Sequence, residues 1–227
     1  RGTDAARVGP VRLVGQGLAP PWEVKLAAYV SFFLAAVFGL ALVALSQAWV
    51  FIPIGLACIV AAWGYTGGSR PYGYRGLGEV MVFVFFGLVA TLGTQLTQAG
   101  RVTWPGVFAA VGVGALASAI LVANNLRDIP SDAVAGKHTL AVRLGDARTR
   151  WLWGALVGVA LLMAAACGLW HVSALIALAS LPLSVPPARA LRAGAVGRDL
   201  VPVLGATGRL QLGYAVLLAL GLILAAR

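Results

Sequence analysis

The sequence predicts an all-α integral membrane protein with seven transmembrane helices. The chain is 60% hydrophobic and 11% charged, and its mean hydropathy is +0.91. A soluble domain of 227 residues could not bury so much apolar surface. The sequence also contains seven apolar runs near the length of about 20 residues that a transmembrane helix needs. Finally, its charges are concentrated in alternate loops.

The seven runs follow one another with short or medium connections. In chain order they are 24–46, 48–66, 79–98, 104–123, 151–170, 172–188 and 207–226. The sixth is the least regular, because three prolines interrupt it and proline removes a backbone donor. Cys58 and Cys167 lie within runs, so we interpret them as packing residues. Gly154 and Gly158 have the spacing that permits close helix packing, within the chain or between chains.

The charge distribution predicts the orientation of these helices. Of the 17 basic residues, 15 lie on one side of the proposed membrane, and all seven acids lie on or next to that side. The positive-inside rule makes it the cytoplasmic side. The cytoplasmic loops are then expected near residues 1–23, 67–78, 124–150 and 189–206. The net charge of +10 is consistent with this topology, with contact to anionic lipid and with attraction of an anionic substrate. Binding of nucleic acid is not expected, because the sequence contains no soluble basic domain.

One polar stretch stands out where the fourth run ends. Asn124-Asn125-Leu126-Arg127-Asp128-Ile129-Pro130-Ser131-Asp132 brings two amides, a guanidinium and two carboxylates to the membrane boundary. Carboxylates are costly near hydrocarbon, which makes the cluster a candidate functional site. Two carboxylates four residues apart share a helix face and can hold Mg²⁺ through oxygen ligands. Because Pro130 disfavours helix, we expect the helix to loosen between Asp128 and Asp132.

Other loops add candidate anion-binding groups. Gly67-Gly68 lets backbone N–H groups approach an anion, and Arg70 is a planar donor suited to phosphate. The nearby tyrosines could belong to an interfacial belt or line an aromatic pocket. Lys137 follows the acidic cluster, and the neighbouring His138 could be a base or a plain surface residue. Asp146 is expected to cap the helix that starts near Ala147.

The stretch NNLRDIPSDAVAGKHTLAVRLGDAR resembles the second aspartate-rich motif of the UbiA superfamily of intramembrane aromatic prenyltransferases. More narrowly it resembles the branch that acts on 1,4-dihydroxy-2-naphthoate. The segment YTGGSRPYGYRGLGE is similar to the tyrosine–glycine–glycine loop of that branch, and RGTDAARVGPVRLV and ATGRLQL also resemble family segments. The resemblance covers the whole chain. Ser69, where proline is common, and His138, where arginine is common, depart from the pattern.

The resemblance implies a nine-helix bundle of which this chain would hold helices three to nine, as one prenyltransferase domain over 1–227. The first two helices and the core of the first aspartate-rich motif would then lie upstream of Arg1. Asp128, Asp132 and Asp4 would bind Mg²⁺, while Asn124 and Asn125 would orient the motif or the metal shell. The family pattern assigns diphosphate binding to the residues Arg70, Arg127, Lys137, Tyr65, Arg7 and Arg12.

The expected activity is transfer of a polyprenyl group to 1,4-dihydroxy-2-naphthoate, with loss of CO₂ and diphosphate, in menaquinone biosynthesis. The expected setting is the bacterial plasma membrane, with the active site toward the cytoplasm and lipid around the helices. One alternative is a prenyltransferase for another acceptor, such as 4-hydroxybenzoate or haem. A second is an organic-anion transporter, although transporters place their sites near the membrane midplane and these runs carry few charges there. No Walker motif, Ser-His-Asp set or Cys/His metal spacing occurs in the sequence.

Overall fold

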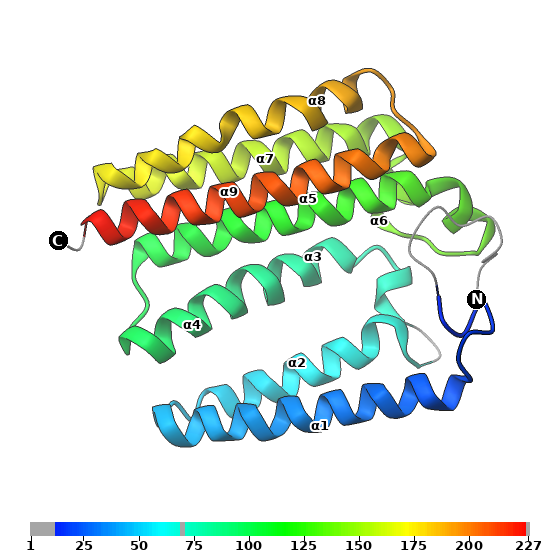
Figure 1. Ribbon diagram of the computed structural model, residues 1–227, viewed down its shortest axis with the longest axis horizontal. Helices are drawn as coiled ribbons and strands as arrows, with labels where there is room; N and C mark the ends of the chain where they lie inside the picture. Colours follow the sequence, from blue (N-terminus) through cyan, green and yellow to red (C-terminus); the bar gives the residue numbers. More distant parts are fainter. Residues whose placement is uncertain (1–11, 69–70, 226–227) are drawn as a thin grey trace. The chain divides into compact units, whose positions relative to one another are not determined.

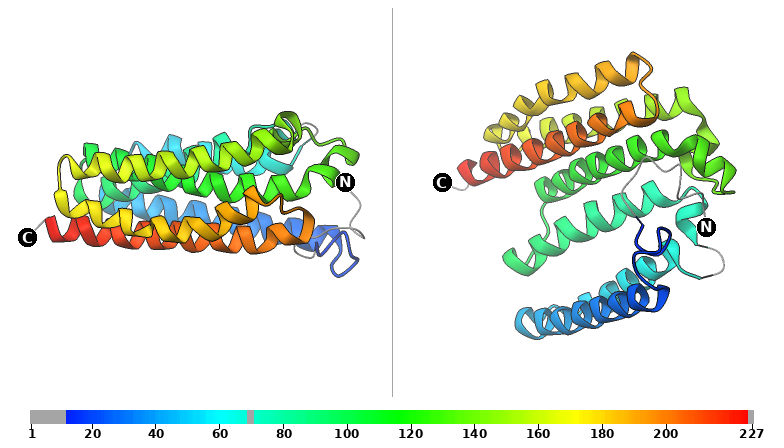
Figure 2. Two further views of the ribbon diagram at one scale, coloured as in Figure 1. Left: turned by 90° about the horizontal axis from the view of Figure 1, so that it is seen from above. Right: turned by 45° about the vertical axis from the view of Figure 1, so that its right-hand side comes forward.

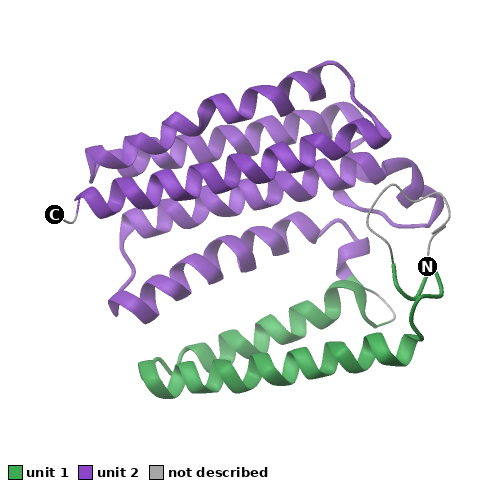
Figure 3. Ribbon diagram, viewed as in Figure 1, with its two compact units in different colours: residues 1–71 green, residues 72–227 purple. Residues whose placement is uncertain are grey.

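The computed structural model describes residues 12–68 and 71–225. Throughout these ranges the regular structure is helical. The chain divides into two compact units, Arg1–Pro71 and Tyr72–Arg227, which are coloured separately in Figure 3. We describe each unit by itself.

Unit 1 is a hairpin of two apolar helices, α1 (Pro21–Ser46) and α2 (Phe51–Thr66). Proline at the first helical position suits the start of α1, because its missing N–H would have no intrahelical partner there. Tyr29 of α1 stacks on Trp63 of α2 with ring centroids 5.6 Å apart. With 16 residues, α2 rises only about 24 Å, which is shorter than the hydrocarbon core of a bilayer.

Unit 2 contains the remaining helices. In order they are η2 (Tyr72–Tyr74), α3 (Gly78–Val82), the π-helix η3 (Phe83–Val89), α4 (Ala90–Ala99), α5 (Trp104–Val134), α6 (Leu140–Leu144), α7 (Asp146–Gly168), η4 (Val172–Ser184), α8 (Val185–Arg192), η5 (Gly197–Leu200) and α9 (Val201–Ala225). Among the described residues, six helical stretches are long and apolar enough to cross a membrane: Pro21–Ser46, Gly78–Ala99, Trp104–Val134, Asp146–Gly168, Val172–Arg192 and Gly197–Ala225.

Helix α5 lies at the centre of unit 2. It packs against α7, α9 and η3, while α9 also packs against η4 (Figure 1). The long helices of this unit keep their side-by-side alignment in both views of Figure 2. The most apolar window of α5 is 61% buried, against 28% for α7 and 22% for the stretch that contains α9. The polar residues after position 123, which extend α5 beyond its apolar run, therefore belong to a helix that is packed on several sides.

The span Gly78–Ala99 crosses α5 at a contact between two glycines. A Cβ added to Gly87 would lie 2.5 Å from Gly114 Cα, so neither helix can accept a side chain there. Gly87 belongs to the π-helix η3, a rare form that is frequently found at functional sites. The crossing fixes the span, including the residues at its start, against the central helix.

Gly87→Ala is expected to destabilise the protein by about 1–3 kcal/mol, because the new methyl group meets backbone atoms that cannot move aside. Thermal unfolding in detergent micelles measures the effect. Gly154→Ala is the matched control, since nothing lies within 4 Å of the Cβ that it adds. Equal unfolding temperatures for the two variants would contradict the assigned crossing.

All seven predicted runs are helical, with some differences at their ends, but among the described residues six rather than seven of them are long and apolar enough to cross a membrane, because α2 has only 16 residues. Helix α5 continues through Pro130 to Val134, so the expected loosening between Asp128 and Asp132 is wrong. Buried Leu126 and Asp132 on either side of the proline are held by tertiary contacts, which override its local preference. The sixth run is a 3₁₀-helix, Val172–Ser184, followed by α8, which agrees with its irregular proline pattern.

One local prediction is wrong, and a second holds for no helix pair of the described residues. Asp146 is the first residue of α7 and makes no side-chain cap; its carboxylate instead accepts two hydrogen bonds from Arg150, one turn later. Gly154 and Gly158 meet no atom within 4 Å where their side chains would be, so they form no close helix crossing among the described residues. Close packing between chains, the other alternative, stays a prediction. The close crossing is made by Gly87 and Gly114.

Candidate functional site

The polar end of α5 is shaped by a glycine. Gly136 has φ +68°, a left-handed conformation that residues with a side chain rarely adopt. Its N–H donates to Ala133 O at 3.2 Å, and the Lys137 N–H donates to Asp132 O at 2.9 Å. These two bonds form a Schellman motif, which ends the helix and turns the chain back on itself. The motif places Lys137 beside the last turn of α5.

The first predicted carboxylate is held by its neighbour in the sequence. Arg127 Nε donates to Asp128 Oδ1 at 2.7 Å, and Arg127 Nη2 donates to Asp128 Oδ2 at 2.8 Å. The guanidinium is almost fully buried, and Nη2 also donates to Asn124 Oδ1 at 2.9 Å. A bidentate pair of this kind fixes both side chains. Asn124 therefore helps to hold the arginine in place.

The second predicted carboxylate is paired through the Schellman turn. Lys137 Nζ donates to Asp132 Oδ1 at 2.8 Å, and both side chains are about nine-tenths buried. The same ammonium lies 5.1 Å from the centre of the Tyr74 ring, at a distance where the cation is attracted to the ring face. The backbone joins the two loops as well, because the His138 N–H donates to Tyr74 O at 2.9 Å.

The tyrosine-containing loop after residue 71 thus lies against the acidic motif. A Cβ on Gly76 would come within 3.4 Å of Arg143 and His138, so this loop and the one after α5 are in close contact. Partial burial raises the pKa of the Tyr72 phenol, which stays protonated at neutral pH and can donate a hydrogen bond. The His138 side chain is exposed, while its backbone N–H and C=O groups make hydrogen bonds to Tyr74 and Arg143. This is the arrangement of a surface histidine.

A further acid joins the motif from α3. Glu79 is only 6% exposed, and its Oε1 accepts a hydrogen bond of 2.8 Å from Asn125 Nδ2. Its backbone carbonyl accepts a bond of 3.1 Å from Ser118 Oγ of α5. Sequence reasoning did not select Glu79 as a site residue. The available signal was its position as the one charged residue of the run 79–98.

The donor set suits a hard divalent cation. Asp128 and Asp132 lie four residues apart on one regular helix, so they share a face and offer carboxylate oxygens. Within the described residues, no group of three or more His, Cys, Asp or Glu side chains forms a complete metal site. A site with only two carboxylates suits Mg²⁺, because this ion usually keeps several waters and substrate phosphate oxygens among its ligands. A site that surrounded the ion with protein groups would leave no room for them.

The other predicted site residues lie in unit 1 or outside the described residues. Tyr65 lies in the last turn of α2, and Arg12 lies in the turn that precedes α1; both belong to unit 1 and are partly buried. Asp4, Arg7 and Arg70 lie outside the described residues. Unit 2 alone therefore brings together Asn124, Asn125, Arg127, Asp128, Asp132 and Lys137.

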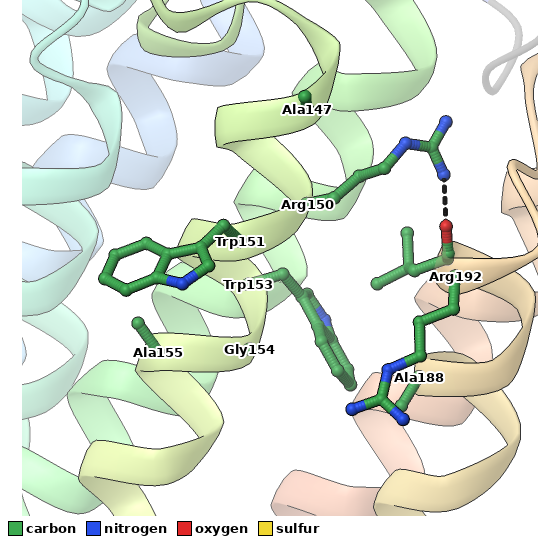
Figure 4. A pocket seen from close by; sticks show the side chains of 9 residues that line it. Ala147, Arg150, Trp151, Trp153, Gly154, Ala155, Ala188 and Arg192 are labelled. Atoms are coloured by element: carbon green, nitrogen blue, oxygen red, sulfur yellow. Dashed lines mark hydrogen bonds between the residues drawn. The ribbon is translucent and has the colours of Figure 1, made fainter.

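A cleft of about 640 Å³ lies between α7 and α8 (Figure 4). Its lining residues are Ala147, Arg150, Trp151, Trp153, Gly154, Ala155, Ala188, Leu191 and Arg192. Arg150 is engaged there, because it donates to the carbonyl oxygens of Leu191 and Ala195, each at 2.8 Å. The lining of this cleft therefore differs in composition from the acidic motif. Through these bonds Arg150 joins α7 to the end of α8.

Lys137→Met is expected to raise the KM for a polyprenyl diphosphate about tenfold, because a partly buried cation contributes a charge-assisted contact. Initial rates at varied diphosphate concentration measure the change. His138→Ala is the matched control, since the adjacent imidazole is exposed. A KM that is unchanged in Lys137→Met would contradict the predicted diphosphate contact.

Comparisons with known proteins agree on one family. The sequence model of the UbiA prenyltransferase family matches residues 1–196. A protein of Mycobacterium tuberculosis named 1,4-dihydroxy-2-naphthoate octaprenyltransferase is 54% identical over 219 residues, which cover 96% of this chain and 75% of that protein. Proteins with the same name from Mycobacterium leprae and Haemophilus influenzae are 51% and 38% identical; in each case 99% of this chain and 76% of the relative are covered.

Proposed function

The chain belongs to the UbiA prenyltransferase family, and we propose that it transfers a polyprenyl group from a polyprenyl diphosphate to 1,4-dihydroxy-2-naphthoate in menaquinone biosynthesis. The relatives described above, which cover nearly the whole chain, carry the name of this activity. The structural observation that supports it most is the pairing of two carboxylates with two cations at the end of the central helix. Such a cluster offers both oxygen ligands for a metal and donors for a diphosphate.

The substrates explain why the site lies where it does. A polyprenyl diphosphate has a lipid-soluble tail and a highly charged head. A bundle of apolar helices can hold the tail between helices or among lipids, while the polar end of α5 meets the head. The predicted cytoplasmic orientation, derived from the positive-inside rule, would open this end to the soluble naphthoate.

Transfer requires cleavage of the allylic carbon–oxygen bond, with its electron pair leaving on the diphosphate. Bound Mg²⁺ supplies charge neutralisation to the leaving group. Asp128 and Asp132 would hold the metal, and Asn124 and Asn125 would keep this face of α5 oriented. Arg127 and Lys137 would donate to the diphosphate oxygens, where negative charge grows as the bond breaks. On the family pattern, we also propose that Tyr65, Arg70, Arg7 and Arg12 bind the diphosphate and that Asp4 binds the metal.

The acceptor then forms the new carbon–carbon bond. A ring carbon of the dihydroxynaphthoate attacks the allylic carbon, and the ring subsequently loses its carboxyl group as CO₂ together with a proton. The allylic cation must be shielded from water during this step. The apolar residues of the bundle provide such shielding. We further propose that the seven hydrophobic helices correspond to helices three to nine of the nine-helix bundle expected from the family resemblance, within one catalytic domain.

Product analysis tests the proposal. The protein, reconstituted in liposomes with Mg²⁺, is incubated with dihydroxynaphthoate and polyprenyl diphosphates of several lengths, and products are identified by mass spectrometry. We expect a prenylated, decarboxylated naphthoquinol. Product from 4-hydroxybenzoate but none from dihydroxynaphthoate would assign another acceptor, and no prenylated product from any aromatic acceptor would reject the proposal.

A further inference from the structure

Glu79 carries a buried oxygen with an unused hydrogen-bonding capacity. Oε1 accepts from Asn125, but within the described part of the chain Oε2 has no hydrogen-bond donor although it is fully buried. A buried carboxylate oxygen without a donor carries the cost of losing water without compensation. Such an atom in a native structure needs an explanation, and a ligand that brings a donor is one.

The position of Glu79 connects this oxygen to the candidate active site. Its partner Asn125 directly follows Asn124, which binds the guanidinium that holds Asp128. Glu79 is also the one charged residue in the span Gly78–Ala99. An acid placed in a transmembrane segment and bonded to a polar motif is a marker of function, because its placement is costly.

The backbone of the same span gives a second, independent indication. The π-helix η3 begins at Phe83, one turn after Glu79, and it packs on α5 through the Gly87–Gly114 crossing. A π-helix is rare, and where it interrupts an α-helix it is frequently found at a functional site. One continuous span thus carries the π-helix, the crossing and the Glu79–Asn125 bond.

We propose that Glu79 Oε2 accepts a hydrogen bond from a ring hydroxyl of the aromatic acceptor and so positions that substrate beside the acidic motif. This assignment rests on the proposed function. The acceptor suits the oxygen because dihydroxynaphthoate offers two phenolic O–H donors, whereas a polyprenyl diphosphate offers none. Glu79 would then be a specificity-determining residue that comes from a different helix than the metal-binding carboxylates.

The hydrogen bond would also assist the reaction. A hydroxyl that donates to a carboxylate forms a short, charge-assisted bond. The bond increases electron density on the phenolic oxygen and, through the ring, on the carbon that attacks the allylic cation. A site built to bond a hydroxyl rejects an analogue without it, because the carboxylate oxygen is then left unpaired. The single oxygen thereby contributes both orientation and selectivity.

The experiment compares Glu79→Gln with the unaltered protein in the liposome assay. Glutamine keeps the shape and an oxygen for Asn125, but it places an amide donor where the free acceptor was. We expect kcat/KM for dihydroxynaphthoate to fall about 10- to 100-fold, while the KM for the polyprenyl diphosphate and the Mg²⁺ requirement change less than about twofold. Acceptors that lack one of the two ring hydroxyls should lose less in the variant than the full substrate does.

Ser118→Ala is the matched control, because it removes a hydrogen bond between the same two helices without touching the carboxylate. It should leave acceptor kinetics unchanged. An unchanged kcat/KM for the acceptor in Glu79→Gln, or a change confined to the diphosphate or to Mg²⁺, would overturn the inference while leaving the proposed function intact. If Glu79→Gln fails to fold, Glu79→Asp replaces it, with the same pattern of kinetic changes expected. Failure of the unaltered protein to prenylate dihydroxynaphthoate would instead remove the proposed function.

Discussion

Asp128→Asn and Asp132→Asn are each expected to lower prenyl transfer roughly 10³-fold, because each removes one of the two carboxylates that offer oxygen ligands on the same face of α5. Asparagine keeps the volume of the side chain and one oxygen that can still accept from Arg127 or Lys137. The change therefore removes negative charge with little effect on packing. Steady-state rates at saturating substrates, with thermal unfolding measured on the same samples, separate catalysis from stability.

Asp146→Asn is the control for both variants. Asp146 is an exposed acid paired with Arg150, and Arg150 keeps its bonds to Leu191 and Ala195 when the acid is neutralised. Exposed pairs contribute little to stability, so this variant should keep its rate and its unfolding temperature. Turnover at the unaltered rate in either Asp128→Asn or Asp132→Asn would refute the metal assignment.

Removal of divalent cations should have an effect of similar size. With an excess of chelator, we expect no measurable transfer, because the leaving diphosphate then lacks the charge that neutralises it. Addition of Mg²⁺ should restore the rate, and Mn²⁺ should substitute because it also prefers oxygen ligands. Transfer measured in metal-depleted liposomes against increasing Mg²⁺ gives the apparent affinity for the cation.

The same titration with the asparagine variants connects the two predictions. If Asp128 and Asp132 hold the cation, higher Mg²⁺ should be needed for half of the remaining activity in either variant, and not in Asp146→Asn. Full activity in excess chelator would count against the whole mechanism. An equal Mg²⁺ requirement in all variants would mean that the metal is not bound by these two carboxylates.

The helices were predictable because they are encoded locally. Apolar runs bounded by charges or prolines gave the position of α1, α2, α5, α7 and α9 to within a few residues at most ends. The continuation of α5 past Pro130 was not predictable, since it depends on packing of buried residues on both sides. Nor does the sequence distinguish the close Gly87–Gly114 crossing from the open Gly154 and Gly158, because all are glycines in apolar runs.

The arrangement of the candidate site was predictable where its residues are neighbours in the sequence. Asn124, Arg127, Asp128 and Asp132 share one motif, and Lys137 is brought to Asp132 by a turn that Gly136 makes possible. Glu79 was missed because its partner Asn125 is 46 positions away, and a lone acid at the end of an apolar run is also typical of a solvated loop. Contacts of this range come from tertiary packing, which one sequence does not show.

The pairing of the acidic motif has a consequence for product release. Arg127 and Lys137 each pair with a carboxylate of the same motif. If these cations bind the diphosphate as we propose, neither would be left buried and unpaired when the diphosphate departs, since each could return to the acid beside it. The two acids would then compete with the leaving ion for its cations, which would favour release of the product.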